Sequence, residues 1–351
     1  YPIDGYGSRE QLSSVIQGFQ PDILWFMTDP RFYTWLWSIE NEIRNRVPMV
    51  YYHVWDNYPY PKYNKTWYDS TDVVVAISKV TDDIVKNVSP DVESHYLPHA
   101  VNPEWFKPLE ESDIQTLKEQ AKLKDKFVVF WNNRNARRKQ PATLVFWFKE
   151  FLDRVGKENA VLLMHTDPLD PNGPNLHAVI QELGLLSGEV MFSTNKIDFP
   201  QMASLYNIAD VTVNISDAEG FGLSTLESLA CGTPIIVNMT GGLKEQATDG
   251  KNWFGVGIEP SSKSIIGSQD IPFIYEDRIS KEDFVSALEK IYNMSDEERR
   301  ELGKTGHNHV QENYNFDAYV EKWEKLLKNV HEVHGSWKSR KAPKRWELLE
   351  V

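Results

Sequence analysis

The chain has 351 residues, more than one ordinary hydrophobic core needs, and this length indicates two domains. Its 38 basic and 51 acidic side chains give a net charge of −13, so nucleic acid is not expected as a partner, because phosphate backbones are bound mainly by Lys and Arg. A single cysteine, Cys231, excludes an intrachain disulfide. Without an apolar run of roughly 20 residues or a signal-peptide pattern, we expect a cytoplasmic protein with at most peripheral membrane contact.

Short apolar runs alternate with amphipathic stretches in the first third of the chain. Residues 21–27, 48–53 and 72–77 are rich in β-branched and aromatic side chains, and they are predicted to be buried parallel strands. Residues 32–46 and 79–88 have helical spacing. This alternation predicts a doubly wound α/β domain over residues 1–108, and the segment 98–108, which contains three prolines, marks its end.

The same alternation resumes after a charged segment at 110–126 and predicts a second α/β domain over 109–315. The predicted strands are 127–131, 160–164, 210–214 and 234–237, and the predicted helices are 141–154, 175–183, 200–208 and 222–230. Residues 280–330 are helical in pattern, with Ser295 capping an acidic first turn, and residues 335–351 form a small basic island.

Residues 217–237 (DAEGFGLSTLESLACGTPIIV) are the most informative stretch. They follow a predicted strand and open a helix, so they lie at the carboxyl end of a parallel sheet, where open α/β folds bind ligands. Gly220 and Gly222 allow close approach of the backbone, and the N–H groups that begin the helix suit a phosphate. Glu219 lies in the loop and Glu227 follows eight residues later in the helix, so their carboxylates can meet different parts of one ligand, such as a ribose diol.

The full string resembles the Glu-x7-Glu signature of retaining glycosyltransferases of the GT4 type, which have the GT-B fold. The resemblance implies two Rossmann-like doubly wound domains facing a cleft, with a nucleotide-diphosphate sugar held mainly by the second. It implies Glu227 on the ribose and Glu219 near the sugar hydroxyls. Main-chain amides near the phosphate and sugar are expected from Gly220, Phe221, Gly222 and Leu223. Residues 316–351 are expected to form a final helix and tail that pack back toward the first domain.

Residues 132–141 (NNRNARRKQP) follow the first strand of the second domain, where this family carries an arginine and a lysine five residues apart. Arg134 and Lys139 have that spacing, and two cations at a strand end suit a diphosphate leaving group. Arg137 and Arg138 lie in the same loop, so the choice of arginine stays open.

Further segments also line up with the family. Residues 190–198 resemble its base-binding loop, where Asn195 is a candidate to flank the nucleobase. In the first domain, His53 and Asp56 follow a strand where the family often places a His or His-Asp near the transferred sugar, although a structural role for His53 stays open. The opening strand and glycine-rich loop of the family have no counterpart, so we expect an N-terminal truncation or a reduced variant.

The activity that the resemblance implies is transfer of a sugar from a UDP- or GDP-sugar to a carbohydrate, lipid-linked or other hydroxyl acceptor, with retention and without a cofactor. No Asp-x-Asp triplet occurs in the sequence, and we expect the diphosphate charge to be neutralised by Arg134, Lys139 and a helix N-terminus rather than by a metal. Two alternatives stay open: a nucleotide-sugar epimerase of the GT-B fold, and a noncatalytic protein that binds nucleotide sugars.

Overall fold

The computed structural model describes residues 5–341 and divides into two compact units. Unit 1 comprises the residues up to Pro98 together with 267–274 and 317–341, and unit 2 comprises 99–266 and 275–316. The division falls ten residues before the predicted boundary at 108, because segment 99–108 packs on unit 2, where the Phe106 ring contacts Phe199 and Tyr206. Residues 1–4, and residues 342–351 of the predicted tail, lie outside the described residues.

Unit 1 is built on a four-stranded parallel sheet in the order β1-β2-β3-β4. The strands are β1 (Leu24–Thr28), β2 (Met49–His53), β3 (Val73–Ala76) and β4 (Glu93–Tyr96). The helices are α1 (Arg9–Phe19), α2 (Thr34–Trp37), α3 (Glu40–Arg44), α4 (Lys65–Asp69), α5 (Lys79–Val88) and α14 (Phe316–His334), the last belonging to this unit from Asp317 on. The three predicted strands correspond to β1, β2 and β3.

Two parts of unit 1 differ from the prediction. The helix predicted over 32–46 is broken, since the Ser38 hydroxyl donates to the Trp35 carbonyl at 2.7 Å and competes with helical bonding. Strand β4 was not predicted, because its residues 93–96 are polar and only partly buried.

The core of unit 1 is rich in aromatic side chains. Tyr51 on β2 stacks on Phe26 of β1, with ring centroids 5.1 Å apart, and α14 places Trp323 edge-on to Tyr52 at 5.0 Å. Ile271, from the short segment 267–274, completes this core. Most of the aromatic residues that crowd the first part of the sequence therefore serve packing.

Unit 2 contains a six-stranded parallel sheet in the order β10-β9-β8-β5-β6-β7. The strands are β5 (Phe127–Asn132), β6 (Ala160–His165), β7 (Val190–Ser193), β8 (Val211–Asn214), β9 (Ile235–Asn238) and β10 (Gly255–Ile258). Read from β7, this is the 3-2-1-4-5-6 order of a doubly wound dinucleotide-binding fold. Strand β10 and a further two-stranded sheet, β11 (Ser262–Ile266) with β12 (Ile274–Arg278), were not predicted.

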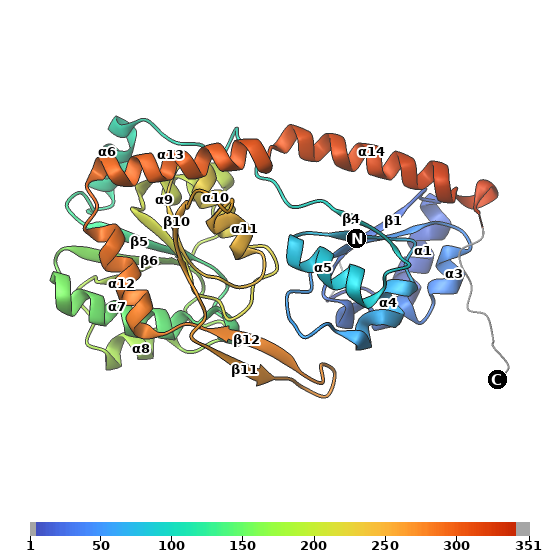
Figure 1. Ribbon diagram of the computed structural model, residues 1–351, viewed down its shortest axis with the longest axis horizontal. Helices are drawn as coiled ribbons and strands as arrows, with labels where there is room; N and C mark the ends of the chain where they lie inside the picture. The colour runs from blue at the N-terminus through green and yellow to red at the C-terminus, as the bar shows by residue number, and fades with distance from the viewer. Residues whose placement is uncertain (1–4, 342–351) are drawn as a thin grey trace. The chain divides into compact units, whose positions relative to one another are not determined.

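Helices cover both faces of the unit 2 sheet, α9, α10 and α13 on one face and α7, α8 and α12 on the other (Figure 1). The helices are α6 (Glu111–Gln120), α7 (Pro141–Val155), α8 (Leu176–Glu182), α9 (Phe199–Ile208), α10 (Leu223–Ala230), α11 (Leu243–Ala247), α12 (Lys281–Tyr292) and α13 (Asp296–Asn313). Ser295 caps α13 in a capping box with Glu298, as its sequence predicts. Among residues 5–341, none of the helices combines the length and hydropathy that a bilayer-spanning segment requires.

Candidate donor-binding site of unit 2

The carboxyl ends of β5 and β8 form the switch point of the unit 2 sheet. These two strands are neighbours, and the chain proceeds outward from them in opposite directions, from β5 through β6 to β7 and from β8 through β9 to β10. The loops that leave them, residues 133–140 and 215–222, therefore begin side by side. Open α/β sheets bind ligands in the crevice at such a point, and both loops carry residues singled out from the sequence.

Lys139 from the first loop and Glu219 from the second form a direct ion pair. Both side chains are only 11% exposed. Asn214, at the end of β8, donates its Nδ2 to the same carboxylate oxygen, Oε2, at 3.4 Å. Burial raises the pKa of Glu219, but the positive charges of Lys139 and Arg138 outweigh this effect and hold the pKa below its usual value. The switch point thus carries a charged and paired carboxylate.

The structure separates the roles of the arginines that precede Lys139. Arg137 makes a two-pronged ion pair with Glu276 on β12. Arg138 donates Nη1 to the Ala218 carbonyl. Its own carbonyl accepts a hydrogen bond from the backbone N–H of Asp217, in the loop after β8, at 2.8 Å. Arg138 therefore ties the loop after β5 to the loop after β8.

Arg134 lies at the exposed rim of the same loop, with 65% of its side chain exposed. Its Nε donates to Asp170 Oδ2 at 2.6 Å and its Nη2 to Oδ1 at 3.3 Å, which is the bidentate geometry that a diphosphate also accepts. Asp170 lies in the loop after β6, and hydrogen bonds from Arg134 and Asn172 hold its pKa well below the usual range. Sequence reasoning missed Asp170, because its setting in residues 166–175 (TDPLDPNGPN) indicates only a turn.

Glycines shape the backbone around Glu219. Gly222 has a φ of 90°, and a Cβ there would lie 2.6 Å from Leu243 Cδ2 and 2.8 Å from Thr225 Oγ1. Gly241, in the loop after β9, has a φ of 49°, and a Cβ there would lie 2.0 Å from the carbonyl oxygen of Glu219. The loop after β9 thus presses directly on the backbone that carries Glu219, a contact that the sequence did not reveal.

The predicted amide donors differ in what they can offer. Phe221 is 3% exposed and its ring packs edge-on against Tyr314 at 5.8 Å, so its side chain is not available to a ligand. Gly220 is buried as well. Leu223 and Ser224 begin α10, and within residues 5–341 their N–H groups have no acceptor. The first turn of α10 is therefore the open end of a helix dipole at the switch point.

Glu227 lies inside α10 and accepts a hydrogen bond at Oε2 from the Tyr206 hydroxyl of α9, at 2.6 Å. Asn132, the last residue of β5, donates Nδ2 to the same hydroxyl at 2.8 Å. Burial raises the pKa of Glu227 to about 7, and the hydrogen bond from Tyr206 opposes this rise. Tyr206 was not identified from the sequence, where it reads only as one apolar position of a helix.

Asn195 and its neighbour Lys196 are exposed in the loop between β7 and α9. Because β7 is separated from β5 by β6, the structure places Asn195 apart from the Lys139–Glu219 pair. A base-binding role for Asn195 stays a prediction.

Comparison with known families decides the class of protein to which this site belongs. Residues 113–309, more than half of the chain, match the family described as "Glycosyl transferases group 1". The chain belongs to this family.

Relatives of the chain share shorter segments with it. D-inositol 3-phosphate glycosyltransferase from Paenarthrobacter aurescens is 34% identical over 110 residues, which cover 31% of this chain and 26% of that protein. MMP alpha-(1->4)-mannosyltransferase from Mycolicibacterium hassiacum is 34% identical over 92 residues, covering 26% of this chain and 22% of that protein. The matched segments thus span about a quarter of each relative's length.

Solved structures extend the likeness over most of the fold. Sucrose-phosphate synthase from Thermosynechococcus elongatus has a TM-score of 0.73 at 21% identity, covering 92% of this chain and 77% of that chain. Anabaena HepE in complex with UDP-glucose has a TM-score of 0.72 at 16% identity, covering 93% and 85%. At these identities the likeness establishes the fold. The GT-B fold and the glycosyltransferase family expected from residues 217–237 are confirmed.

The two candidate residues of unit 1, His53 and Asp56, differ in their exposure. His53 has no exposed surface, and its Nε2 forms a hydrogen bond with the Tyr68 hydroxyl at 2.7 Å. Burial lowers its pKa to about 3, so the ring is neutral. This burial favours a structural role for His53, and its predicted contact with the sugar stays a prediction. Asp56 lies in the loop after β2, is partly exposed, and stays a candidate.

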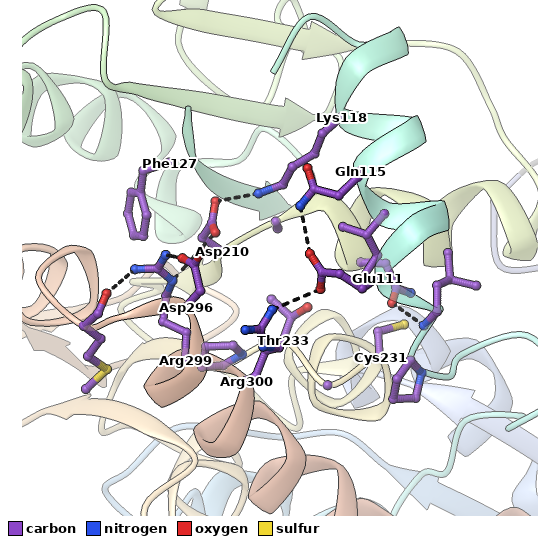
Figure 2. Close-up of a pocket in the computed structure, with 18 of the residues that line it drawn as sticks. Glu111, Gln115, Lys118, Phe127, Asp210, Cys231, Thr233, Asp296, Arg299 and Arg300 are labelled. Atoms are coloured by element: carbon purple, nitrogen blue, oxygen red, sulfur yellow. Dashed lines mark hydrogen bonds and ion pairs between the residues drawn. The ribbon is translucent and has the colours of Figure 1, made fainter. Parts of the chain in front are cut away.

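A cavity of about 720 Å³ opens at the amino-terminal end of the unit 2 strands. It is lined by α6, α13 and the amino ends of β5 and β9 (Figure 2). Lys118 and Arg299 reach Asp210 at 3.1 and 3.7 Å, and Arg300 pairs with Glu111 at 3.3 Å. These cations are engaged in ion pairs that tie α6 and α13 to the sheet. Because the switch point lies at the opposite, carboxyl-terminal end of the strands, we assign the cavity no part in donor binding.

Proposed function

We propose that this protein transfers a sugar from a UDP- or GDP-sugar to a hydroxyl group of a carbohydrate or lipid-linked acceptor, with retention of configuration. The observation that carries the proposal is the buried Lys139–Glu219 pair at the switch point of a nucleotide-binding type of sheet. Family membership supports it, and so does the UDP-glucose bound by Anabaena HepE, a protein of the same fold.

The diphosphate of the donor is assigned to the cations and amides at the switch point. Lys139 and Arg134 supply positive charge, and the open N–H groups that begin α10 supply hydrogen bonds. These groups stabilise the negative charge that develops on the leaving diphosphate. Losing one such donor typically costs on the order of 100-fold in rate. No metal or cofactor is part of the proposal.

The two glutamates are assigned to the sugars of the donor. Glu227 binds the ribose diol, and Glu219 lies near the hydroxyls of the transferred sugar. Each carboxylate has one oxygen, Oε2, engaged by the protein, and within the described residues 5–341 no protein partner is recorded for either Oε1. A carboxylate oxygen accepts hydrogen bonds from sugar hydroxyls, so each glutamate can serve the protein and the donor at once.

Retention requires the acceptor to attack from the face that the diphosphate leaves. The bond between the anomeric carbon and the phosphate oxygen breaks, the bond to the acceptor oxygen forms, and the acceptor proton passes to the departing diphosphate. Lys139 and Arg134 hold the leaving group in place for this transfer. The chain therefore has to orient reactants and stabilise charge, and it needs no covalent intermediate.

The test begins with thermal-shift and calorimetric titration of the 351-residue chain with UDP-glucose and GDP-mannose. Lys139→Ala and Glu227→Ala are expected to weaken binding. The matched control is Lys149→Ala, which removes a lysine from a surface pair with Asp153 on α7. Unchanged donor affinity in both site variants would overturn the assignment.

Product analysis then separates the possible activities. Transfer to an acceptor panel, with retention seen by NMR of the product, supports the proposal. Isomerised donor in the absence of an acceptor identifies an epimerase. Tight donor binding with neither hydrolysis nor transfer identifies a noncatalytic binding protein.

A further inference from the structure

A chain of two hydrogen bonds runs from the sheet of unit 2 to Glu227. Asn132, at the carboxyl end of β5, donates Nδ2 to the Tyr206 hydroxyl at 2.8 Å, and the hydroxyl donates to Glu227 Oε2 at 2.6 Å. The three residues come from β5, α9 and α10. The chain therefore connects the switch point of the sheet to the carboxylate that the proposed function assigns to the ribose.

The direction of this chain is fixed. An amide Nδ2 can only donate, so the Tyr206 oxygen accepts from Asn132 and is left to donate its own proton. Burial, followed by the charge of Glu227, holds the pKa of Tyr206 well above its usual value, so the phenol keeps its proton at every working pH. Both bonds therefore point toward Glu227.

The surroundings of Tyr206 allow its ring little freedom. The residue has no exposed surface, and the ring packs edge-on against Phe130 with centroids 5.0 Å apart. Its carbonyl accepts from the Thr233 hydroxyl at 2.7 Å. A side chain held in this way can hold its partner in turn, because its hydroxyl position is set by packing before any ligand binds.

We propose that Tyr206 is a positioning residue for the nucleotide ribose: it holds one oxygen of Glu227 and leaves the other directed to the ribose diol. This inference rests on the proposed function. Within residues 5–341, Glu227 Oε1 has no protein partner and is not buried away from solvent. A two-oxygen carboxylate held on one side by a phenol presents the second oxygen in one orientation, whereas an unheld carboxylate would rotate.

The same hydrogen bond also governs the charge of Glu227. Burial raises the pKa of Glu227 to about 7, and Tyr206 lowers it, so removing the hydroxyl raises the pKa further. At pH 7 a larger share of Glu227 would then be protonated, and a protonated carboxyl loses acceptor capacity for the diol. The loss is recovered at higher pH, where Glu227 ionises again.

Other titratable groups near α10 do not control this effect. Cys231 lies at the end of α10, and burial raises the pKa of its thiol, so it stays neutral. Helix α13 meets α10 through Gly306, which lies against Leu229, and through His307, whose Nδ1 bonds with the Ala230 carbonyl. The charged residues of α11 are Lys244 and Glu245, and β8, β9 and α9 bring no other ionisable side chain than Tyr206. Burial and Tyr206 set the pKa of Glu227.

The test compares the wild-type chain with Tyr206→Phe. Affinity for UDP-glucose, GDP-mannose and their 2′-deoxyribose analogues is measured by calorimetry between pH 6 and 9. The uracil and guanine bases begin to lose a proton near pH 9, so each variant is compared with the wild type at the same pH. At pH 7 we expect donor affinity to fall about 10-fold, as for loss of a hydrogen bond to a charged group. For Tyr206→Phe we expect the midpoint of the curve of affinity against pH to lie about one pH unit higher than in the wild type. We also expect the variant to lose the preference for ribose over 2′-deoxyribose at pH 7 and to regain it at pH 9.

Two further variants keep the test decisive. Tyr51→Phe removes a buried hydroxyl in unit 1 that donates to the Thr28 carbonyl at 2.7 Å, and it should change neither the midpoint nor the ribose preference. Should Tyr206→Phe fold poorly, Asn132→Ala removes the first bond of the chain and should shift the midpoint in the same direction by less.

The outcomes separate this inference from the proposed function. If the wild type binds a donor but Tyr206→Phe keeps the wild-type midpoint and ribose preference, the inference is overturned while the proposed function stands. An affinity loss that is equal at every pH and for both riboses means a merely structural role and also overturns it. If the wild type binds neither donor, the proposed function fails and the inference fails with it.

Discussion

Replacing Lys139 by methionine should destabilise unit 2, and more so at high pH. The ion pair with Glu219 has both side chains 11% exposed, and the only other side chain within hydrogen-bond distance of that carboxylate among residues 5–341 is Asn214, at 3.4 Å. Removing one member of a buried pair leaves an uncompensated charge and costs about 3–5 kcal/mol. Because Arg138 still contributes positive charge near Glu219, we expect the lower end of this range, about 3 kcal/mol at pH 8.

The pH dependence follows from the direction of the pKa shift. In the wild type the pKa of Glu219 lies below its usual value, so the pair contributes stability that is present above the unfolded pKa and lost as pH falls through the folded pKa. Without Lys139, burial dominates and raises the pKa of Glu219. The variant then gains stability relative to the wild type as the carboxyl becomes protonated, and the difference between the two proteins shrinks toward pH 5.

The assay is hydrogen-deuterium exchange. The exchange protection of peptides from β5 and β8 measures the stability of unit 2 separately from that of unit 1. A loss of 3 kcal/mol corresponds to protection about 100-fold lower at pH 8. The double variant Lys139→Met, Glu219→Gln should recover part of the loss, since it removes the stranded charge. Equal protection in the wild type and Lys139→Met at pH 8, or a deficit that does not shrink at pH 5, would refute the reasoning.

Three further variants probe the site from other directions. Glu219→Gln keeps the shape of the side chain, so we expect turnover to fall at least 10-fold in steady-state kinetics while calorimetric donor affinity changes less; a loss confined to affinity would contradict its place near the sugar. Arg134→Ala should weaken donor binding and make it less sensitive to salt, checked by calorimetry at 50 and 300 mM NaCl, since one phosphate contact is lost. His53→Asn should lower the melting temperature through loss of the Tyr68 contact and leave donor affinity unchanged; lost affinity at an unchanged melting temperature would restore His53 as a ligand contact.

Much of the fold could be predicted because local pattern and global topology agree. Runs such as residues 127–131 and 160–164 are apolar throughout, as strands covered on both faces must be, and they lie in β5 and β6. Strand β4 escaped prediction because it lies at a sheet edge with polar residues. The unit boundary was misplaced because the prolines up to Pro108 mark irregular backbone, whereas the side chain of Phe106 decides which unit that backbone belongs to.

The candidate site was predictable only in its backbone. Glycines and helix-start residues form a continuous string, so the turn around Glu219 could be located from the sequence. Its side-chain partners come from loops 36 to 80 residues away, as with Arg134 and Asp170 or Lys139 and Glu219, and no local pattern encodes such pairs. The burial of His53 could not be predicted for the converse reason: its place after a strand is a local property, whereas its burial depends on the whole of unit 1.

The pairing of both candidate phosphate-binding cations changes what donor binding must involve. Lys139 already holds Glu219 and Arg134 already holds Asp170, so a diphosphate that reaches either cation meets a carboxylate there. The exposed Arg134 pair is worth little in water, and a diphosphate can replace Asp170 at small cost. The buried Lys139 pair is different, because separating it would strand Glu219. We therefore expect the diphosphate to bind Lys139 while the bond between Lys139 and Glu219 persists, which gives a contact of three groups. At Arg134, by contrast, we expect the diphosphate to replace Asp170.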